Sequence, residues 1–414
     1  MTKVKVIDAI CGAGKSTHIM KHMREHKDER WIYASPYLTE VGDGRTEGRI
    51  QKALPEMEFI SPDGSKGKHL KELISSGSNV AITHALLMQL DKECLTLIQA
   101  GGYNLVIDET LDVVSTYKRI PRDDLRGLVG NYVILNPTTN RLSWNTSTYG
   151  DDYSGMFKDI KDMCDLESLY LHKETVLINK LSNQVVRSAK SVTVLTYLFE
   201  GSFMQAWLDI ANIEWEYEKL DSGIDPEVIK QKVRDNLIIE TTKKLDALNY
   251  PKGLYLRSAY SSSWYNSNPE LMEEIRQGCE NYLSKLRRKI DKRQVFWTTF
   301  KKYAEELKGR GYTRGATLSS DGEILTPFVT KNKRASNEYA DSNICMYLVN
   351  VFPHGDITSY LQSQGYTIDA DKFAISEMVQ FIFRGSIRKD EPMHLLVASR
   401  RMETLLKEWL DSPF

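Results

Sequence analysis

The sequence predicts an α/β fold built on two parallel-sheet domains in tandem, with an insertion in or after the first. Three observations indicate this class: a strand, glycine-rich loop and helix at the start of the chain; several short apolar runs that each end in polar residues; and a length of 414 residues, too long for one ordinary core. We expect the first domain over 1–215, an insertion at about 115–187, and the second domain over 230–414.

Composition describes a globular chain without a strong charge bias. Hydrophobic residues make up 41% and charged residues 27% of the chain, and the net charge is −1 from 55 basic and 56 acidic residues. Any nucleic-acid surface must therefore be a local patch. The five cysteines lie far apart with no C-x-x-C pair, which argues against a zinc ribbon or a disulfide framework.

The sequence gives no reason to expect a membrane partner. No apolar run reaches the roughly 18 residues that a membrane span needs. The chain opens directly into an apolar strand, so we expect no signal peptide and a cytoplasmic location.

The glycine-rich loop at 9–17 is the strongest motif. It follows an apolar strand at 4–7 and precedes a helix expected at 17–26. Its glycines let successive backbone N–H groups face one concavity, and the helix N-terminus adds partial positive charge. This arrangement predicts a phosphate site. The expected nucleotide-binding residues are Gly12, Ala13, Gly14, Lys15, Ser16, Thr17 and, from a later strand, Asp108.

Two adjacent carboxylates, Asp108 and Glu109, follow the apolar run at 103–107. Lys15 would contact the β- and γ-phosphates of ATP, and Ser16 and Asp108 would hold Mg²⁺. Glu109 would act as the general base that activates water. Neighbouring acids at a strand end are common by chance, but their position after a phosphate loop favours the catalytic interpretation.

Other strand ends also carry polar side chains. Ser35, Pro36 and Tyr37 end a second strand, and Thr83 and His84 end a third. Ligands of α/β proteins bind at the carboxyl edge of the sheet, so these residues are candidates to contact phosphate or a nucleic-acid backbone. The alternatives are an ordinary turn after the second strand and a helix cap at Thr83.

The second half contains a basic run and a set of long polar side chains. The run reaches from Lys285 to Arg293 and includes Arg287 and Arg288; it fits either a solvated helix face or a nucleic-acid contact. Further on, Gln380, Arg384 and Arg388 recur every four residues, which predicts that they share one face of a helix. That face could meet phosphate, or it could be a solvated surface.

Taken together, these segments resemble the DEAD/DEAH-like helicases of superfamily 2, especially compact phage-encoded ones. The matched segments are 9–17, 35–38, 83–84, 108–110, 196–197, 333–341 and 380–388. The resemblance implies two RecA-like domains that bind ATP and Mg²⁺ between them, with a nucleic-acid strand crossing both. It implies that Ser35, Pro36, Tyr37, Thr83 and His84 contact that strand, and the basic run adds Arg287 and Arg288 as further nucleic-acid candidates.

The same resemblance makes Arg384 and Arg388 candidate arginine fingers and gives Gln380 a role in ordering water or the γ-phosphate. The sequence departs from the family where its arginines stand four apart rather than three, which leaves open which one is the finger. The Asp-Glu-Thr-Leu segment also places apolar Leu111 where the family has a polar residue.

The function that follows is an ATP-dependent helicase or translocase on nucleic acid, with DNA favoured over RNA, acting in the host cytoplasm if the chain is phage-encoded. Two alternatives share the phosphate loop. One is a terminase-type packaging ATPase, and the other is an NTP-driven ATPase that binds a protein partner through the insertion. A small-molecule kinase fits less well, because such kinases are usually much shorter.

Overall fold

The computed structural model describes residues 3–286, 294–313, 317–318, 324–330 and 337–412. The chain divides into two compact units. The N-terminal unit comprises Met1–Ala9, Gly14–Ser222 and His354–Asp369; the C-terminal unit comprises Ile10–Ala13, Gly223–Pro353 and Ala370–Phe414. Within the described ranges, no helix combines the length and apolarity that crossing a membrane requires.

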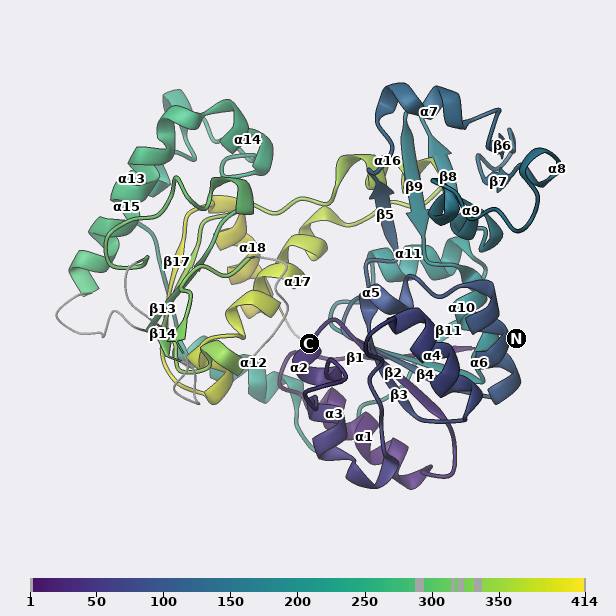
Figure 1. Ribbon diagram of the computed structural model, residues 1–414. Helices are drawn as coiled ribbons and strands as arrows, with labels where there is room; N and C mark the ends of the chain where they lie inside the picture. Colours follow the sequence, from purple (N-terminus) through teal and green to yellow (C-terminus); the bar gives the residue numbers. More distant parts are fainter. Residues whose placement is uncertain (1–2, 287–293, 314–316, 319–323, 331–336, 413–414) are drawn as a thin grey trace. The chain divides into compact units, whose positions relative to one another are not determined.

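The N-terminal unit is built on a sheet of six parallel strands (Figure 1). In spatial order they are β11 (Trp215–Tyr217), β1 (Val4–Asp8), β10 (Ser191–Thr196), β4 (Asn104–Asp108), β2 (Trp31–Ser35) and β3 (Val80–Thr83). All five residues of β2 and of β4 are buried, as expected when helices cover both faces of a parallel sheet.

Alternation along these strands sorts the apolar side chains into two cores. Leu105 and Ile107 pack in the core that also holds apolar residues of four helices, of α5 (His84–Leu87) and of α16 (Gly355–Ser363). Val106 packs in a second core, with apolar residues of two other helices and of α2 (Leu38–Val41). The first four helices are α4 (Lys66–Ser75), α6 (Lys92–Gly101), α10 (Asn183–Ser188) and α11 (Phe203–Ile210). The other two are α1 (Lys15–Glu25) and α3 (Arg49–Ala53). Short elements α2 (Leu38–Val41), η1 (Pro55–Met57) and α5 (His84–Leu87) complete the surroundings of the sheet.

A small antiparallel domain occupies the region expected to be an insertion. Its three-stranded sheet has the order β5 (Val114–Tyr117), β9 (Val176–Lys180), β8 (Leu169–His172), and a hairpin joins β6 (Val133–Leu135) to β7 (Leu142–Trp144). The helices are α7 (Arg122–Leu128), α8 (Thr146–Tyr149) and α9 (Lys158–Asp165). Leucines, Trp144 and Ile160 form a separate apolar core here, so this region is a packed domain rather than a loop.

The C-terminal unit is also built on a parallel sheet, with the order β12 (Leu237–Glu240), β17 (Met393–Val397), β16 (Ile344–Tyr347), β13 (Val295–Thr298). Its helices are α12 (Pro226–Asn236), α13 (Lys243–Ala247), α14 (Ser262–Ser267), α15 (Met272–Leu286), α17 (Ala370–Ile382) and α18 (Arg400–Asp411). Shorter elements are η2 (Pro251–Gly253), η3 (Pro269–Leu271), η5 (Lys301–Tyr303), η6 (Asn337–Tyr339), η7 (Ser386–Lys389) and the pair β14 (Thr317–Leu318) and β15 (Ile324–Leu325).

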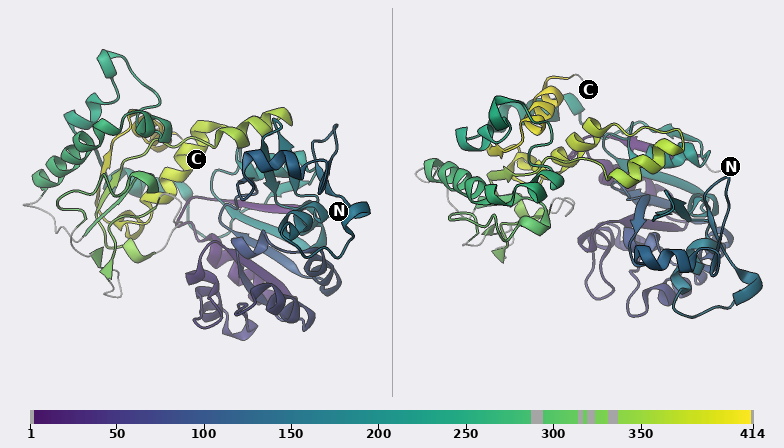
Figure 2. Two further views of the ribbon diagram at one scale, coloured as in Figure 1. Left: turned by 45° about the horizontal axis from the view of Figure 1, so that its top comes forward. Right: turned by 90° about the horizontal axis from the view of Figure 1, so that it is seen from above.

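Residues 354–369 interrupt the C-terminal half of the sequence but pack in the N-terminal unit; we call them the returning segment. They fall inside the range expected for the second domain. The helix of this segment, α16 (Gly355–Ser363), packs against β5, and the yellow-green segment lies beside the blue and teal strands of the N-terminal unit in each view (Figure 2). Tyr360 and Leu361 are buried in the main core of that unit.

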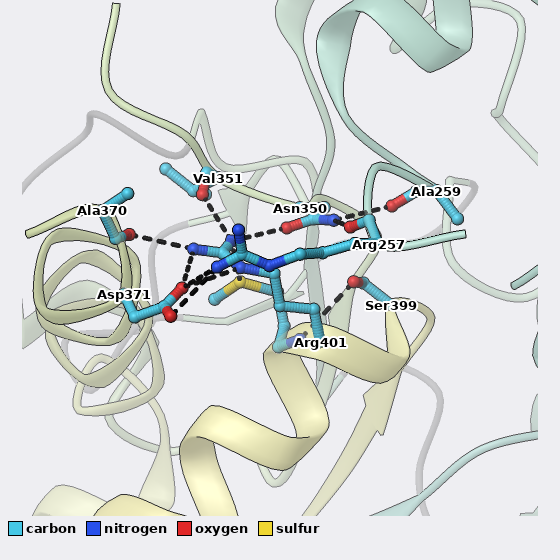
Figure 3. Close-up of polar contacts among 9 residues, drawn as sticks. Arg257, Ala259, Asn350, Val351, Ala370, Asp371, Ser399 and Arg401 are labelled. Carbon is cyan, nitrogen blue, oxygen red and sulfur yellow. Dashed lines mark hydrogen bonds and ion pairs between the residues drawn. The ribbon is translucent and has the colours of Figure 1, made fainter. Parts of the chain in front are cut away.

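Arg401 on α18 binds the chain on both sides of the returning segment (Figure 3). Its guanidinium donates to the Val351 carbonyl (2.9 Å), which precedes the segment, and to the Ala370 carbonyl (2.9 Å), which follows it. It also pairs with the Asp371 carboxylate (2.5 Å), is only 4% exposed and donates to Asn350. This buried charge is therefore paired and hydrogen-bonded. Arg401 holds together the residues at which the chain leaves the C-terminal unit and enters it again.

Candidate site at the carboxyl edge of the first sheet

The six parallel strands bring most of the predicted first-domain residues to one edge of the sheet. Along this edge the order is the loop after β1, Thr196 after β10, Asp108 after β4, Ser35 after β2 and Thr83 after β3. One strand, β10, separates β1 from β4, so the loop and the carboxylates start about 10 Å apart at a spacing of about 4.8 Å per strand. After β1 the chain continues to β2 and β3, which lie on one side of β1, and after β10 it continues to β11 on the other side of β1. This reversal of strand order makes the edge a topological switch point.

The loop after β1 has the backbone that a phosphate cradle needs. Gly12 and Gly14 have φ values of 85° and 84°, in the left-handed region that favours glycine. A Cβ at Gly12 would meet no atom within 4 Å, so the protein leaves space on that side of the loop. Gly14 is the N-cap residue of α1, and no side chain caps the first turn of this helix.

Lys15 is the first residue of α1, so the helix starts two residues earlier than expected, and Ser16 and Thr17 lie in its first turn. The Lys15 side chain is only 7% exposed, and its ammonium donates to the Ala9 carbonyl at the start of the loop. The Lys15 side chain therefore reaches back to the residue that follows β1, at the start of the loop. These residues fit a nucleotide phosphate.

Asp108 is a buried carboxylate at the end of β4. The hydroxyl of Tyr33 on β2 donates to its Oδ2 at 2.5 Å. Burial, followed by the charge of Glu109, raises the pKa of Asp108 to about 7, and the Tyr33 hydrogen bond opposes that shift. A divalent cation would reverse the cost of ionising this group, so the residue fits a Mg²⁺ ligand.

Glu40 and Arg49 place a second pair of charges near Asp108. Arg49 Nε donates to Glu40 Oε2 at 2.6 Å, joining the short helices α2 and α3 that follow β2. Among the smaller effects on Asp108, the Glu40 charge raises its pKa and the Arg49 charge lowers it. This pair was not predicted, because an isolated Glu and an isolated Arg nine residues apart carry no signal in a sequence.

Glu109, the candidate base, has an unusual backbone. Its φ of 69° is in the left-handed region, which costs a non-glycine residue about 1–2 kcal/mol. The side chain is partly exposed, whereas Asp108 beside it is buried. The turn thus separates two adjacent carboxylates, one inside the sheet edge and one toward solvent.

Two contacts tie the end of β10 to its neighbours. Thr110 Oγ1 and Thr196 Oγ1 are 3.3 Å apart, which links the turn after β4 to β10. Asp8, the last residue of β1, accepts hydrogen bonds from the backbone N–H groups of Leu198 (2.8 Å) and Phe199 (2.9 Å). Burial raises the pKa of Asp8, while these bonds and the Lys15 charge lower it, so Asp8 lies within the field of the phosphate-loop lysine.

The outer strand ends behave differently from one another. Thr83 Oγ1 accepts from the Leu86 N–H at 3.3 Å and so caps α5, as in the alternative that the sequence left open. His84 and Ser35 are both buried, and Ser35 Oγ has no hydrogen-bond partner within the described part of the chain. Pro36 and Tyr37 lead into α2.

Arg287 and Arg288, like residues 333–336, lie outside the described residues.

The prediction that Gln380, Arg384 and Arg388 share one helix face is wrong. Helix α17 ends at Ile382, so only Gln380 lies on it; Arg384 follows in a turn, and Arg388 lies in η7. Three residues beyond the helix end, Gly385 lies in a tight environment: a Cβ there would approach Met393 Sδ to 2.5 Å and the Ser342 carbonyl oxygen to 2.8 Å.

The two arginines also differ in environment. Arg384 is buried, with its guanidinium 4.6 Å from the centre of the Phe381 ring, where it makes a cation–π contact. Arg388 is exposed. The pair therefore does not form the continuous cationic surface that the four-residue spacing suggested.

Fold and strand ends define an α/β protein with a glycine-rich loop at the edge of a parallel sheet and a second, Rossmann-like sheet domain. The family model of the YonV C-terminal Rossmann-like domain matches residues 231–410, and that of the YonV middle domain matches residues 114–179. The chain is 31% identical over 433 residues to the SPbeta prophage-derived protein YonV of Bacillus subtilis (strain 168), and the match covers 100% of both chains. The chain belongs to the YonV family.

These findings confirm the predicted α/β class with parallel sheets in two domains. Among solved structures, Xpd4 of S. tokodaii is similar with a TM-score of 0.45 and 11% identity, covering 99% of this chain and 94% of that chain. A likeness this distant carries no argument about function.

Proposed function

We propose that this protein is an ATP-dependent motor that moves along or unwinds nucleic acid, with DNA favoured over RNA. The observation that carries the proposal is the shared sheet edge: a loop with two left-handed glycines and a buried lysine, and two strands away a buried Asp108 beside a partly exposed Glu109. Phosphate binding, metal binding and activation of water are the three tasks of NTP hydrolysis, and this edge has a group for each.

In this proposal the loop N–H groups and Lys15 bind the β- and γ-phosphates. Ser16 and Asp108 would hold Mg²⁺, whose charge would neutralise that of the phosphates. Glu109 positions the attacking water and accepts its proton. Asp8 and Thr110 couple the nucleotide to β10, because each contacts the end of that strand. Gln380, Arg384 and Arg388 remain candidates to complete the site, with either arginine as the finger.

The prophage relative supports the narrower proposal of a phage-encoded protein acting in the host cytoplasm. Nucleic-acid contacts are proposed for Ser35, Pro36, Tyr37 and His84 on the first sheet edge and for Arg287 and Arg288. Thr83 is the weakest member of this set, because its hydroxyl oxygen already caps α5.

The test is steady-state ATP hydrolysis by the purified chain, without polymer and with single-stranded DNA, duplex DNA or RNA. We expect one polymer to stimulate turnover, and Lys15→Ala to abolish it. Arg384→Ala and Arg388→Ala, measured separately, identify the finger by a loss of about 10³-fold or more in one of them. Turnover that persists in Lys15→Ala would overturn the proposal.

The alternative of an ATPase that acts on a protein partner is favoured by one feature of the middle domain. Ile134 is 50% exposed and Met156 86% exposed there, and the same domain contains the stacked rings of Tyr132 and Tyr149. If Lys15-dependent hydrolysis is indifferent to every polymer, this surface becomes the place to look for a partner.

A further inference from the structure

The C-terminal unit contains a cavity with a distinctly cationic lining. Its volume is about 540 Å³, and among the described residues its lining is formed by Thr242, Lys243, Lys244, Asn281, Ser284 and Lys285. Three of these carry a positive charge, three are neutral hydrogen-bonding residues, and none is acidic. In a chain with a net charge of −1, this concentration of lysine is local.

Two elements build the cavity. Thr242 and the two following lysines stand at the start of α13, immediately after β12, and the other three residues lie on α15. Asn281, Ser284 and Lys285 are three and four residues apart, so they share one face of that helix. Helices α13 and α15 pack together through Leu245 and residues such as Ile275, which fixes the two halves of the lining relative to each other.

Among the described residues, no carboxylate forms an ion pair with Lys243, Lys244 or Lys285. Glu240, at the end of β12, accepts hydrogen bonds from Tyr282 (2.7 Å) and interacts with His394 (3.0 Å). Lys244 donates to the neutral Gln277 amide at 2.7 Å, which uses one of its three N–H donors and neutralises none of its charge. A ligand bearing several negative oxygens would therefore complement the lining.

We propose that this cavity binds consecutive phosphates of a nucleic-acid strand. The volume is within the range of about 300–1,000 Å³ typical of ligand sites, and the described part of the lining has no aromatic residue on which a base could stack. The contact is therefore with the backbone and independent of base sequence. The inference rests on the proposed function, since the cavity would provide the nucleic-acid contact of the motor's C-terminal unit.

The test is binding of a labelled oligo-dT to the full-length protein without nucleotide, between 50 and 300 mM KCl. We expect the triple variant Lys243→Ala/Lys244→Ala/Lys285→Ala to bind at least tenfold more weakly at 100 mM KCl. Its plot of log affinity against log salt should be flatter by about 2, because each phosphate contact to a single strand contributes about 0.7.

The control is Lys301→Ala/Lys302→Ala/Lys308→Ala, which removes the same charge from exposed positions of the same unit. It should keep the wild-type slope. Equal losses in both variants, or no loss in the first, would overturn the proposal. Since no ATP is present, a failure of Lys15-dependent hydrolysis would leave this result standing.

A second arm separates a nucleic-acid backbone from a free phosphate ligand. Inorganic phosphate is titrated at constant ionic strength and followed by calorimetry. We expect no saturable binding below about 10 mM, because one phosphate engages only part of the lining. Sub-millimolar phosphate binding that the first triple variant loses, with oligo-dT binding unchanged, would reassign the cavity to a small phosphorylated ligand and overturn the proposal.

Discussion

The Tyr33 hydroxyl on β2 donates a hydrogen bond to the carboxylate of Asp108 on the neighbouring strand β4, at 2.5 Å. The bond is buried and joins the middle of β2 to the end of β4. It favours the ionised form of a carboxylate whose pKa is raised by burial, and in the proposed function it would lower the pH at which Asp108 binds Mg²⁺.

Replacing Tyr33 with phenylalanine should therefore shift the pH profile of ATP hydrolysis. Loss of the donor raises the pKa of Asp108 above its value of about 7, and the acid limb of the profile should move to higher pH by about one unit. Initial rates at saturating Mg²⁺ between pH 6 and 9 measure this. Tyr103→Phe is the matched control, because that buried hydroxyl donates only to backbone carbonyls. A uniformly lower rate with an unmoved profile would contradict the assignment.

Gly12→Ala should remove nucleotide binding while leaving the protein folded. The substitution strains a left-handed residue by about 1–2 kcal/mol but introduces no clash, so only a small drop in melting temperature is expected. In the proposed function the new methyl group would occupy space that the phosphates need, so ATP affinity should fall at least tenfold in equilibrium binding. Gly102→Ala is the control, with a φ of 65° and no atom within 4 Å, at the end of α6. Equal affinity losses in both variants would show that strain alone is responsible.

Lys180→Met should stabilise the N-terminal unit at neutral pH. Burial, and then the Arg141 charge, lowers the pKa of Lys180 from 10.5 to about 8; its ammonium lies 3.9 Å from the centre of the Tyr170 ring. Between pH 8 and 10.5 the unfolded chain holds a proton that the folded chain has released, so this group's contribution to stability rises with pH across that window. The penalty is complete below pH 8.

Thermal unfolding of Lys180→Met and wild type checks this sign. The variant should gain about 1–3 kcal/mol at pH 7, and the gain should shrink toward pH 10.5. Lys118→Met, at an exposed position of the middle domain, should leave both the stability at pH 7 and its dependence on pH unchanged. A destabilised Lys180→Met protein at pH 7 would mean that the cation–π contact outweighs the cost of burying the charge.

Leu361→Ala should loosen the N-terminal unit although Leu361 lies far along the C-terminal half of the sequence. Its side chain is fully buried in the main core of that unit, and truncation should cost about 2–5 kcal/mol. Limited proteolysis with mapped cleavage sites should show new cuts within residues 3–222. Leu406→Ala, an equally buried leucine on α18, should instead expose sites in the C-terminal unit. The same cleavage pattern in both would refute the placement of the returning segment.

The strand ends of the first sheet could be predicted because fully buried parallel strands are short, continuous apolar runs. Asp108 and Glu109 stand out where such a run stops, and the glycine-rich loop is recognisable by residue type alone. Tyr33 could not be singled out, since a tyrosine inside an apolar run is typical of any strand. Its role depends on β2 lying next to β4, which the sequence does not state.

The helix-face prediction failed for a different reason. Four-residue spacing identifies a face only while the helix continues, and α17 stops at Ile382, before Arg384 and Arg388. The sequence did contain a sign in Gly385, a poor helix former. Its effect could not be judged without knowing that the Ser342 backbone passes beside it.

Arg401 donates to the carbonyls of both Val351 and Ala370, on either side of the returning segment. This arrangement has a consequence for how the protein could evolve or be engineered. Because the chain leaves the C-terminal unit and returns to it, the two units do not follow one another in the sequence. A recombination event at a single junction therefore could not exchange one of them. A gene fragment ending near residue 222 would encode the first sheet without the helix that covers part of its core. The halves must be inherited together, and a working split protein needs its break elsewhere.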